Sequence, residues 1–387
     1  MSSGFTRAAA PQSPHEREQL PPPVSPGAPG ALRIVALLPA HNEAAVVHAS
    51  IEALLAQERP LDRIVVVSDN SSDDTLAIAR SYPGVTAIET VGNVHRKSGA
   101  LTAAWLRFAT DADLVVSLDA DTELAPNAVG DWEREFLADP KLGAAASKFL
   151  TVKTGSLWTR LQRFEFAMWA DYGLRRKSVP VVSGTGCMYR NLVLREVASR
   201  DDREGPWSYD SAVEDYELTY RIKRAGYACR TSPTVRAFTD AMPTLRALWG
   251  QRLKWQAGTV EDMLRIGFDR YTARCWLRQL GGAAAVLLRI LSPLILVLGI
   301  FLGAVHFNPI WLLIPLISIL VDVKRVRQMP FRDGRDLLLA VSFVPNEILN
   351  TLRCIWYVQA WAIVLRTRVT GRQRDLWGRQ YAAEGRG

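Results

Sequence analysis

Apolar runs and helical patterns alternate along residues 31–150, and this alternation is the strongest constraint on the fold. The runs typical of strands lie at 34–38, 64–67, 85–88, 114–118 and 142–149, and the helical patterns lie at 43–56, 72–81, 97–109 and 125–137. Strands that alternate with helices favour a parallel sheet with helices on both faces. We therefore predict an α/β domain built on a mostly parallel sheet.

Composition limits the class of partner and the compartment. The chain has 387 residues, of which 48% are hydrophobic, so it is long enough for one large or two ordinary domains. A net charge of +8 favours anionic partners, namely nucleic acid, phosphorylated substrates or anionic lipid. The positive charge clusters beside long apolar runs, so we predict no nucleic-acid partner. The four cysteines form no Cys-x-x-Cys pair, which argues against a zinc site and favours a reducing compartment.

Residues 1–30 carry seven prolines and little apolar content. This composition predicts a disordered, Pro-rich leader. The segment has no apolar core, so we expect it to be neither a signal peptide nor a membrane anchor.

Two apolar runs predict a transmembrane hairpin over residues 281–323. Gly282 to His306 is interrupted only by Arg289, and about 23 such residues reach roughly 34 Å, enough to cross a bilayer core. The second run, 309–323, is a returning span or a soluble core helix. Basic residues flank both outer ends and none lies in the short link, so the positive-inside rule places both flanks in the cytoplasm. The preceding domain, 31–280, is therefore predicted to be cytoplasmic.

A third apolar stretch, Leu337 to Leu365, is basic at both ends and contains several polar residues. A single crossing would violate the charge rule, so an interfacial helix or a re-entrant hairpin is predicted for 324–370, followed by a basic cytoplasmic tail at 371–387. The segment from Leu157 to Arg176 has an apolar helical period beside several arginines. It is predicted to be either a second interfacial helix or an ordinary core helix.

Polar residues follow each of the first four predicted strands. They are His41, Asn42 and Glu43 after the first strand, Asp69 at the end of the second, Lys97 after the third, and Asp119 and Asp121 after the fourth. The carboxyl ends of parallel strands share one edge, where ligands of open α/β sheets bind. Two carboxylates suit Mg²⁺ or Mn²⁺ shared with a substrate phosphate, although such a pair can also simply end a strand. Because no glycine-rich phosphate loop is present, we predict a nucleotide diphosphate held through metal.

Asp215 is the candidate catalytic base. Leu218, Ile222 and Ala225 follow it at helical spacing, so Asp215 lies near a helix N-terminus, where the helix dipole keeps a carboxylate ionised. An ionised carboxylate can accept the proton that an attacking hydroxyl loses. The alternative is that Glu214 and Asp215 are ordinary acidic residues of a first helical turn.

Two later segments complete the pattern: the glycine-rich run from Ser183 to Arg190, and Gln251-Arg252-Leu253-Lys254-Trp255. Arg252 and Lys254 can hold a diphosphate, and Trp255 offers a flat apolar face to a sugar ring, unless it only packs in a core. Over residues 34 to about 260 the chain resembles the family 2 inverting glycosyltransferases with a GT-A fold. The resemblance is to the membrane-integrated, processive branch that includes cellulose, chitin, hyaluronan and poly-N-acetylglucosamine synthases.

The resemblance implies a role for each motif residue. The implied donor-binding residues are His41, Asn42, Glu43, Asp69, Lys97, Asp119, Asp121, Arg252 and Lys254, with Asp69 at the uracil and Asp119 and Asp121 at the metal. The implied acceptor-binding residues are Gly184, Thr185, Gly186, Glu214, Gln251 and Trp255, and Asp215 is the implied catalytic base. Val213 and Lys254 depart from the family's Thr-Glu-Asp and Gln-x-x-Arg-Trp patterns.

These observations predict a multi-pass membrane enzyme that needs Mg²⁺ or Mn²⁺. It would move a sugar from a nucleotide-diphospho-sugar, UDP-linked by the resemblance, to a polysaccharide or lipid-linked glycan at the cytoplasmic membrane face. Direct attack with one base inverts the anomeric centre, which predicts a β-linkage. The alternatives are nucleotidyl transfer and a catalytically weak nucleotide-sugar-binding partner subunit of a synthase complex. We also predict assembly with a partner subunit or as a homo-oligomer.

Overall fold

The computed structural model describes residues 32–176, 178–200, 203–306, 308–329, 331–372 and 374–385. The predicted leader, 1–30, lies outside the described residues. The chain divides into two compact units that interleave along the sequence. The first unit comprises the residues up to Val152, Trp169–Tyr209 and Arg221–Asp240, and the second comprises Lys153–Met168, Asp210–Tyr220 and the residues from Ala241 onward. The domain boundaries given above, which treat 31–280 as one domain, remain predictions.

Within the described residues, eight strands of the first unit form one sheet in the order β3-β2-β1-β4-β7-β6-β8-β5. The strands are β1 Ile34–Ala40, β2 Arg63–Asp69, β3 Val85–Thr90, β4 Leu114–Leu118, β5 Thr122–Leu124, β6 Leu142–Leu150, β7 Gly186–Arg190 and β8 Ala228–Thr239. The five predicted strands are therefore confirmed as β1, β2, β3, β4 and β6. Every residue of β1 is buried, as expected for a central strand covered on both faces.

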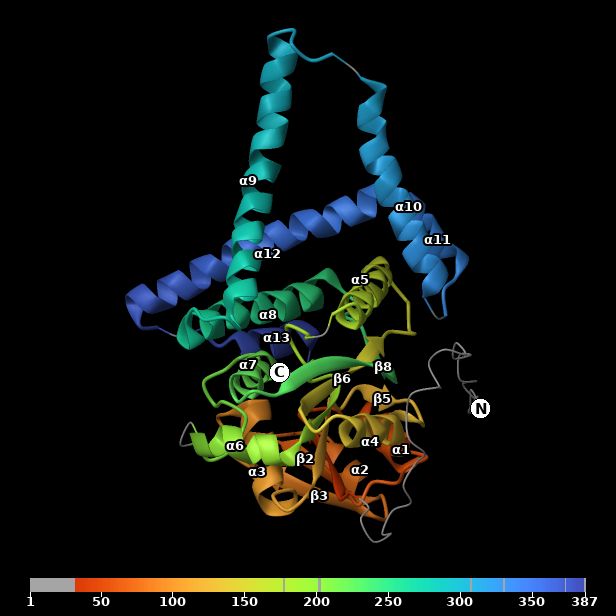
Figure 1. Cartoon of the computed structure of the whole chain (residues 1–387), viewed down its shortest axis with the longest axis vertical. Helices are drawn as coiled ribbons and strands as arrows, with labels where there is room; N and C mark the ends of the chain where they lie inside the picture. Colours follow the sequence, from red (N-terminus) through yellow and green to blue (C-terminus); the bar gives the residue numbers. More distant parts are fainter. Residues whose placement is uncertain are drawn as a thin grey trace. The chain divides into compact units, whose positions relative to one another are not determined.

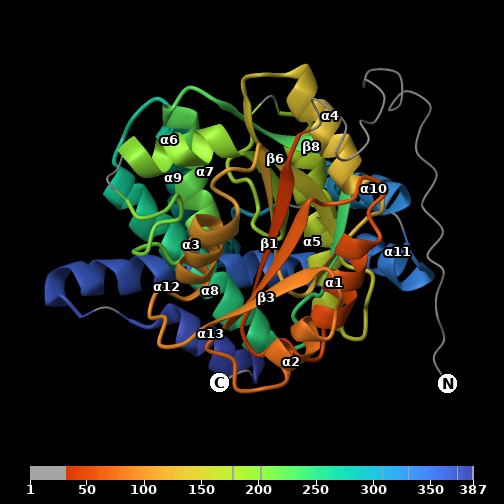
Figure 2. The ribbon, with the colours of Figure 1, turned by 90° about the horizontal axis from the view of Figure 1, so that it is seen from below.

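The predicted helices of this region are confirmed as α1 Val47–Leu55, α2 Thr75–Arg80, α3 Arg96–Phe108 and α4 Ala128–Ala138. Figure 2 shows α1 and α2 on one side of strands β1 and β3, and α3 on the other. Their apolar sides bury residues such as Ile51 and Trp132 against the sheet. Helices therefore cover both faces, as the strand–helix alternation predicts.

The sheet is mixed, which refines the prediction of a mostly parallel sheet. Strand β1 pairs in parallel with β2 and β4, β2 with β3, and β6 with β8. Strand β7 is antiparallel to β4 and β6, and β5 is antiparallel to β8. Every antiparallel pair includes a strand that the apolar pattern did not predict. Strand β5 has only three residues, and β8 is rich in polar residues and contains Pro233, so neither gives a strong periodic signal.

The remaining helices are α5 Leu157–Leu174, α6 Asn191–Arg200, α7 Glu214–Arg224, α8 Leu245–Ile266, α9 Ala273–Phe301, α10 Leu313–Gln328, α11 Gly334–Val341, α12 Phe343–Thr370 and α13 Leu376–Glu384. In the second unit, α8 packs against α12 and α13. Trp249 of α8 meets Trp356 of α12 edge-on, with ring centroids 5.8 Å apart. A second apolar cluster joins the same three helices through Ala257, Val260, Ala360, Val364 and Leu376.

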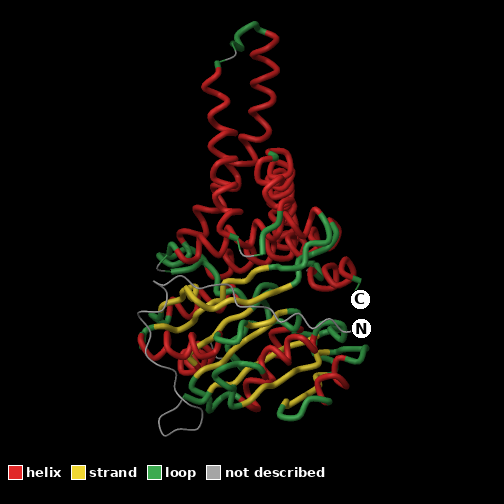
Figure 3. Tube along the Cα trace, turned by 90° about the vertical axis from the view of Figure 1, so that its right-hand side faces the viewer, coloured by secondary structure: helices red, strands yellow, loops and turns green. Residues whose placement is uncertain are grey.

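Two helices of the described residues, α9 and α12, are long and apolar enough to cross a membrane by length and composition. No residue in the most apolar stretch of α9 is buried, whereas 28% of that of α12 is buried. The second run of the predicted hairpin begins with a short 3-10 turn, Pro309–Leu312, and continues into α10. The N-terminal part of α10 projects away from the other helices of the unit, as the C-terminal part of α9 does, whereas Val326 near the end of α10 packs against Ala340 of α11 (Figures 1 and 3). Residues 343–370 form one continuous helix, and the interfacial or re-entrant placement of 324–370 remains a prediction.

Arg289, the one charge inside the apolar run of α9, has partners on α12. Its guanidinium pairs with Glu347 and donates a hydrogen bond of 2.7 Å to Thr351 Oγ1. About two turns earlier in α9, a Cβ atom added at Gly282 would lie 2.6 Å from the ring of Tyr357 of α12. The two helices therefore touch closely, and pairing explains why an apolar helix tolerates an arginine.

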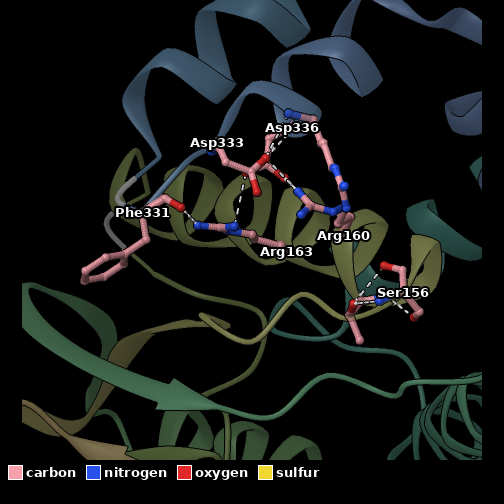
Figure 4. Close-up of polar contacts among 8 residues, drawn as sticks. Ser156, Arg160, Arg163, Phe331, Asp333 and Asp336 are labelled. Carbon is pink, nitrogen blue, oxygen red and sulfur yellow. Dashed lines mark hydrogen bonds and ion pairs between the residues drawn. The ribbon is translucent and has the colours of Figure 1, made fainter. Parts of the chain in front are cut away.

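Helix α5 fits the core-helix alternative better than the interfacial one. Leu161 and Gln162 are buried, and Arg160 and Arg163 reach Asp333 and Asp336 at the start of α11 (Figure 4). Arg160 Nη1 lies 2.7 Å from Asp333 Oδ1 and 3.0 Å from Asp336 Oδ1. The hydrogen bond from Arg160 lowers the pKa of Asp333 to about 2. These arginines therefore bind protein carboxylates that themselves cap α11.

Candidate functional site

The loops at the carboxyl edge of the sheet hold residues in a strained backbone conformation. Asn42, Asn70 and Arg96 have φ values of 52°, 49° and 51°, in the left-handed region. Asn adopts this region more readily than most residues, whereas an arginine there is uncommon. Such residues cost on the order of 1–3 kcal/mol each and gather at functional sites. The three loops that follow β1, β2 and β3 thus share the character of a ligand-binding rim.

Asp69 ends β2 and is only 5% exposed. Its Oδ1 accepts hydrogen bonds from Thr90 Oγ1 at 2.6 Å and from Asn93 Nδ2 at 2.8 Å. His41 Nδ1 lies 2.6 Å from the backbone oxygen of Asp69. Among the residues that the structure describes, Oδ2 accepts no hydrogen bond, so a rigidly held carboxylate presents one oxygen to a ligand.

Sequence reasoning missed Thr90 and Asn93 as supports of Asp69. Thr90 pairs with Asp69 in the parallel register of β2 and β3, which becomes visible only once the strand order is known. The sequence feature that marks the place of Asn93 is Gly99, where an added Cβ atom would lie 2.2 Å from Asn93 Oδ1. Glycine at that position leaves the room that the Asn93 side chain needs.

The loop after β1 is bonded to the loop after β2. Asn42 Oδ1 accepts a hydrogen bond from Ser72 N at 2.8 Å, and Glu43 N donates one of 2.9 Å to Thr75 Oγ1. Asp73, which precedes α2, accepts hydrogen bonds from Ala44 N at 2.9 Å and from Thr75 N at 3.0 Å. Burial alone would raise the pKa of Asp73, but these hydrogen bonds hold it below its usual value.

Lys97 and Asp119, both predicted to bind the donor, meet at the end of β4. Lys97 Nζ lies 2.5 Å from Asp119 Oδ1, and the two side chains are 14% and 34% exposed. Asp121 Oδ1 accepts hydrogen bonds from Thr122 Oγ1 at 3.2 Å and from Thr239 Oγ1 at 3.4 Å. The carboxylates are therefore oriented by a cation on one side and by two hydroxyls on the other.

The two carboxylates fit an ion that arrives with its substrate. Within the described ranges, no three His, Cys, Asp or Glu side chains form a ready-made metal cage. Mg²⁺ does not require one, because it usually takes one or two carboxylates and completes its shell with water and substrate phosphates. Asp119 and Asp121 supply the hard oxygen ligands that such an ion prefers. Lys97 would then share Asp119 with the ion.

The glycine-rich segment lies beside Asp119. Thr185 O accepts a hydrogen bond of 3.4 Å from Asp119 N, and Gly186 begins β7 opposite Leu118 of β4. Ser183 Oγ lies 3.0 Å from Thr185 Oγ1. In the first unit, the structure thus brings the segment containing Gly184, Thr185 and Gly186 to the same sheet edge as the predicted metal ligands.

Asp215 and the segment from Gln251 to Trp255 belong to the second unit. Asp215 lies in the first turn of α7, which confirms the predicted helix start, and its Oδ1 accepts a hydrogen bond of 2.7 Å from Tyr216 N. Glu214 is 6% exposed. Burial of Glu214 and partial exposure of Asp215 give the two neighbouring carboxylates different environments.

The motif residues of α8 have protein partners. Arg252 is buried, donates to Glu165 Oε2 at 2.6 Å and to Gln251 Oε1 at 2.9 Å, and lies over the Trp255 ring. Burial lowers the pKa of Arg252, and Glu165 partly offsets this. Lys254 is also buried, with Nζ 3.1 Å from the centre of the Trp377 ring. Sequence reasoning missed Glu165 and Trp377, and the donor-binding roles of Arg252 and Lys254 remain predictions.

Comparison with known proteins bears on this geometry. Residues 36–198 match the family described as Glycosyl transferase family 2. The probable glycosyltransferase YdaM of Bacillus subtilis is 28% identical over 249 residues, which cover 60% of this chain and 57% of YdaM. The poly-β-1,6-N-acetyl-D-glucosamine synthase of Staphylococcus epidermidis is 26% identical over 235 residues, which cover 59% of this chain and 55% of the synthase. The chain thus spans little more than half the length of these relatives.

A solved structure with a similar fold is the mannosyltransferase PcManGT from Pyrobaculum calidifontis, in complex with GDP-Man and Mn²⁺. The TM-score is 0.57 at 19% identity, and the match covers 86% of this chain and 87% of PcManGT. The fold is therefore GT-A, as predicted, followed by long apolar helices at the C-terminal end.

The chain therefore combines a GT-A fold with carboxylates along one edge of its sheet. Residues 36–198 therefore resemble glycosyltransferase family 2, and the chain is distantly similar to the poly-β-1,6-N-acetylglucosamine synthases.

Proposed function

We propose that the enzyme moves a sugar from a UDP-linked donor to a polysaccharide or lipid-linked glycan at the cytoplasmic membrane face, with inversion to a β-linkage. The observation that carries the proposal is the arrangement of carboxylates along one edge of the sheet. Strand β1 lies between β2 and β4, so Asp69 and Asp119 flank the loop that carries His41. Asp69 can accept a hydrogen bond from the nucleobase, while Asp119 can bind the diphosphate through a metal ion.

In this proposal the donor residues divide the nucleotide between them. Asp69 accepts the imide N–H of uracil through Oδ2, while Thr90 and Asn93 hold Oδ1 in place. Lys97 places a positive charge beside Asp119, where the diphosphate would lie. A bound Mg²⁺ or Mn²⁺ held by Asp119 and Asp121 would neutralise charge on the diphosphate as it leaves.

Asp215 acts as the general base. As the acceptor oxygen forms its bond to the anomeric carbon, Asp215 takes the proton of the hydroxyl, and the bond to the diphosphate breaks. Because attack is direct and from the opposite side, an α-linked donor gives a β-linked product. Trp255 offers its ring face to the acceptor sugar, and Gln251 offers an amide for its hydroxyl groups.

The long apolar helices support a membrane location. No residue in the most apolar stretch of helix α9 is buried, as expected for a helix in contact with lipid. The apolar run of α9 is preceded by Arg270, Arg274 and Arg278, and the apolar residues of α10 are followed by Lys324, Arg325 and Arg327. By the positive-inside rule, these basic residues favour cytoplasmic flanks. We infer a multi-pass protein of the cytoplasmic membrane whose catalytic residues face the cytoplasm.

A second candidate function is a nucleotide-sugar-binding partner subunit with weak catalysis. The burial of Arg252 and Lys254 against Glu165 and Trp377 favours it, because these cations already have partners. The presence of Asp119, Asp121 and Asp215 together favours the enzyme.

The test is release of nucleotide diphosphate by membranes that carry the full chain, supplied with a panel of nucleotide sugars. We expect release from a UDP-sugar that disappears in Asp215→Asn and on removal of divalent metal with EDTA. Binding of the donor without release from any member of the panel would support the partner-subunit alternative. Release that persists in Asp215→Asn would refute the assignment of the base.

A further inference from the structure

One face of α8 carries both the acceptor motif and a contact with the segment before Asp215. Gln251, Trp255, Gly258 and Asp262 follow one another at spacings of four, three and four residues. At 3.6 residues per turn, such positions form a single stripe along a helix. The first two belong to the Gln251–Trp255 motif, and the last two meet residues 211–213.

Gly258 lets residues 212–213 approach α8 closely. A Cβ atom added at Gly258 would lie 3.0 Å from Val213 Cγ2 and 3.2 Å from Ala212 Cβ. Distances in this range are tighter than ordinary van der Waals contact, so a side chain here would displace the segment by a few tenths of an ångström. The packing of the Ala212 and Val213 side chains, just before Asp215, thus depends on the absence of a side chain at Gly258.

Asp262, one helical turn further along α8, fixes the same segment by hydrogen bonds. Ser211 Oγ donates to Asp262 Oδ2 at 2.5 Å, and Val213 N donates to Ser211 Oγ at 3.0 Å. Asp262 is 1% exposed. The chain of two hydrogen bonds runs from a buried carboxyl group of α8 to the backbone amide that opens the first turn of α7.

A buried carboxyl group at this position is costly. The charged and titratable groups around Asp262 are Arg265, whose Nη1 lies 3.4 Å from Oδ1, together with Glu217 and Glu261. Burial raises the pKa of Asp262 to about 8, although Ser211 and Arg265 act in the opposite direction. An apolar side chain would avoid the desolvation cost. The hydrogen bond to Ser211 is what the carboxyl group provides that an apolar side chain cannot.

We propose that Asp262 is a positioning residue for sugar transfer: through Ser211 it fixes Asp215 relative to Gln251 and Trp255 on the same face of α8. The proposal rests on the proposed role of Asp215 as the base. The helix acts as a rigid spacer, so the distance between the base and the acceptor is set within the second unit. Positioning of this kind matters because a misplacement of about 1 Å can lower a rate about 100-fold.

The test compares Asp262→Ala, Ser211→Ala and Asp262→Asn in membranes that carry the full chain. We expect the first two to lower kcat about 10- to 100-fold while the KM for the UDP-sugar stays unchanged. Asp262→Asn keeps an oxygen that accepts from Ser211, so it restores kcat. The double variant of Ser211 and Asp262 should lose no more than Asp262→Ala alone.

Ser232→Ala is the matched control, because it removes a buried hydrogen bond of the same kind in the first unit. Ser232 Oγ donates to Glu135 Oε1 at 2.5 Å, and both residues are buried. We expect Ser232→Ala to lower the thermal unfolding midpoint by a similar amount and to leave kcat unchanged. If Ser232→Ala lowers kcat equally, Asp262 is only a stabilising residue and the inference is wrong.

The Asp215→Asn background separates this inference from the proposed function. If Asp262 acts through Asp215, Asp262→Ala costs nothing further in the residual activity of Asp215→Asn. A further loss there, or additive losses from Ser211→Ala and Asp262→Ala, would overturn the inference. Full activity of Asp215→Asn itself would instead overturn the role of Asp215 as the base.

Discussion

Glu165 is the residue of the second unit whose loss we expect to be most costly. Its Oε2 accepts from Arg252 Nη2 of α8 at 2.6 Å, and its Oε1 accepts from Arg353 Nη2 of α12 at 2.9 Å. Glu165 and Arg252 are 2% and 6% exposed, whereas Arg353 is 38% exposed. One carboxylate therefore joins three helices and separates two positive charges.

The size of the effect follows from burial. Glu165→Gln keeps the shape of the side chain but leaves Arg252 as a buried charge without its counterion, which costs roughly 3–5 kcal/mol. Arg353→Met leaves the pair of Glu165 and Arg252 intact and removes a partly exposed partner, which costs about 1 kcal/mol or less. The two expected losses of unfolding free energy differ, although each variant removes one member of the same network.

The assay is thermal unfolding of the purified full chain, followed by tryptophan fluorescence. At about 2–4 °C per kcal/mol for a unit of roughly 150–250 residues, Glu165→Gln should lower the midpoint by about 10 °C. Arg353→Met should lower it by less than about 4 °C. A midpoint of Glu165→Gln within about 2 °C of the parent would refute the reasoning, because the guanidinium of Arg252 would then be neutralised or hydrated in some other way.

Three further predictions concern single side chains. Because burial raises the pKa of Asp262 to about 8, its contribution to stability is full below about pH 4 and is lost as the pH rises to about 8. At about 1.4 kcal/mol per pKa unit this amounts to several kcal/mol, and denaturant titrations of Asp262→Asn and the parent should diverge over that range in favour of the variant. Lys97→Met should raise the donor KM about 10-fold, yet lower the metal concentration for half-maximal rate, since Asp119 loses a competing cation; a higher metal requirement would contradict this. Thr90→Val removes a hydrogen bond to a carboxylate worth about 1.5–3 kcal/mol, so donor binding measured by calorimetry should weaken at least 10-fold. Thr86→Val on the same strand is the control and should have little effect on donor binding.

The elements that the sequence predicts well are those with a strong local pattern. The strands β1, β2 and β4 are continuous apolar runs, and α9 is an apolar run of membrane length, so their type follows from composition and period alone. The first turn of α7 is also visible locally, because acidic residues precede an apolar helical period. Residues at the ends of such elements, Asp69, Asp119 and Asp121 among them, can therefore be identified as candidates from the local pattern.

Sequence alone determined the α/β architecture with long apolar helices and which loops follow the first strands, because periodicity and chain order are local properties. Only the tertiary structure decided which side chains support the candidates. Thr90 meets Asp69 through strand register, Glu165 meets Arg252 across 87 positions, and Ser211 meets Asp262 across 51. These pairings depend on sheet order and helix packing, which no local pattern encodes.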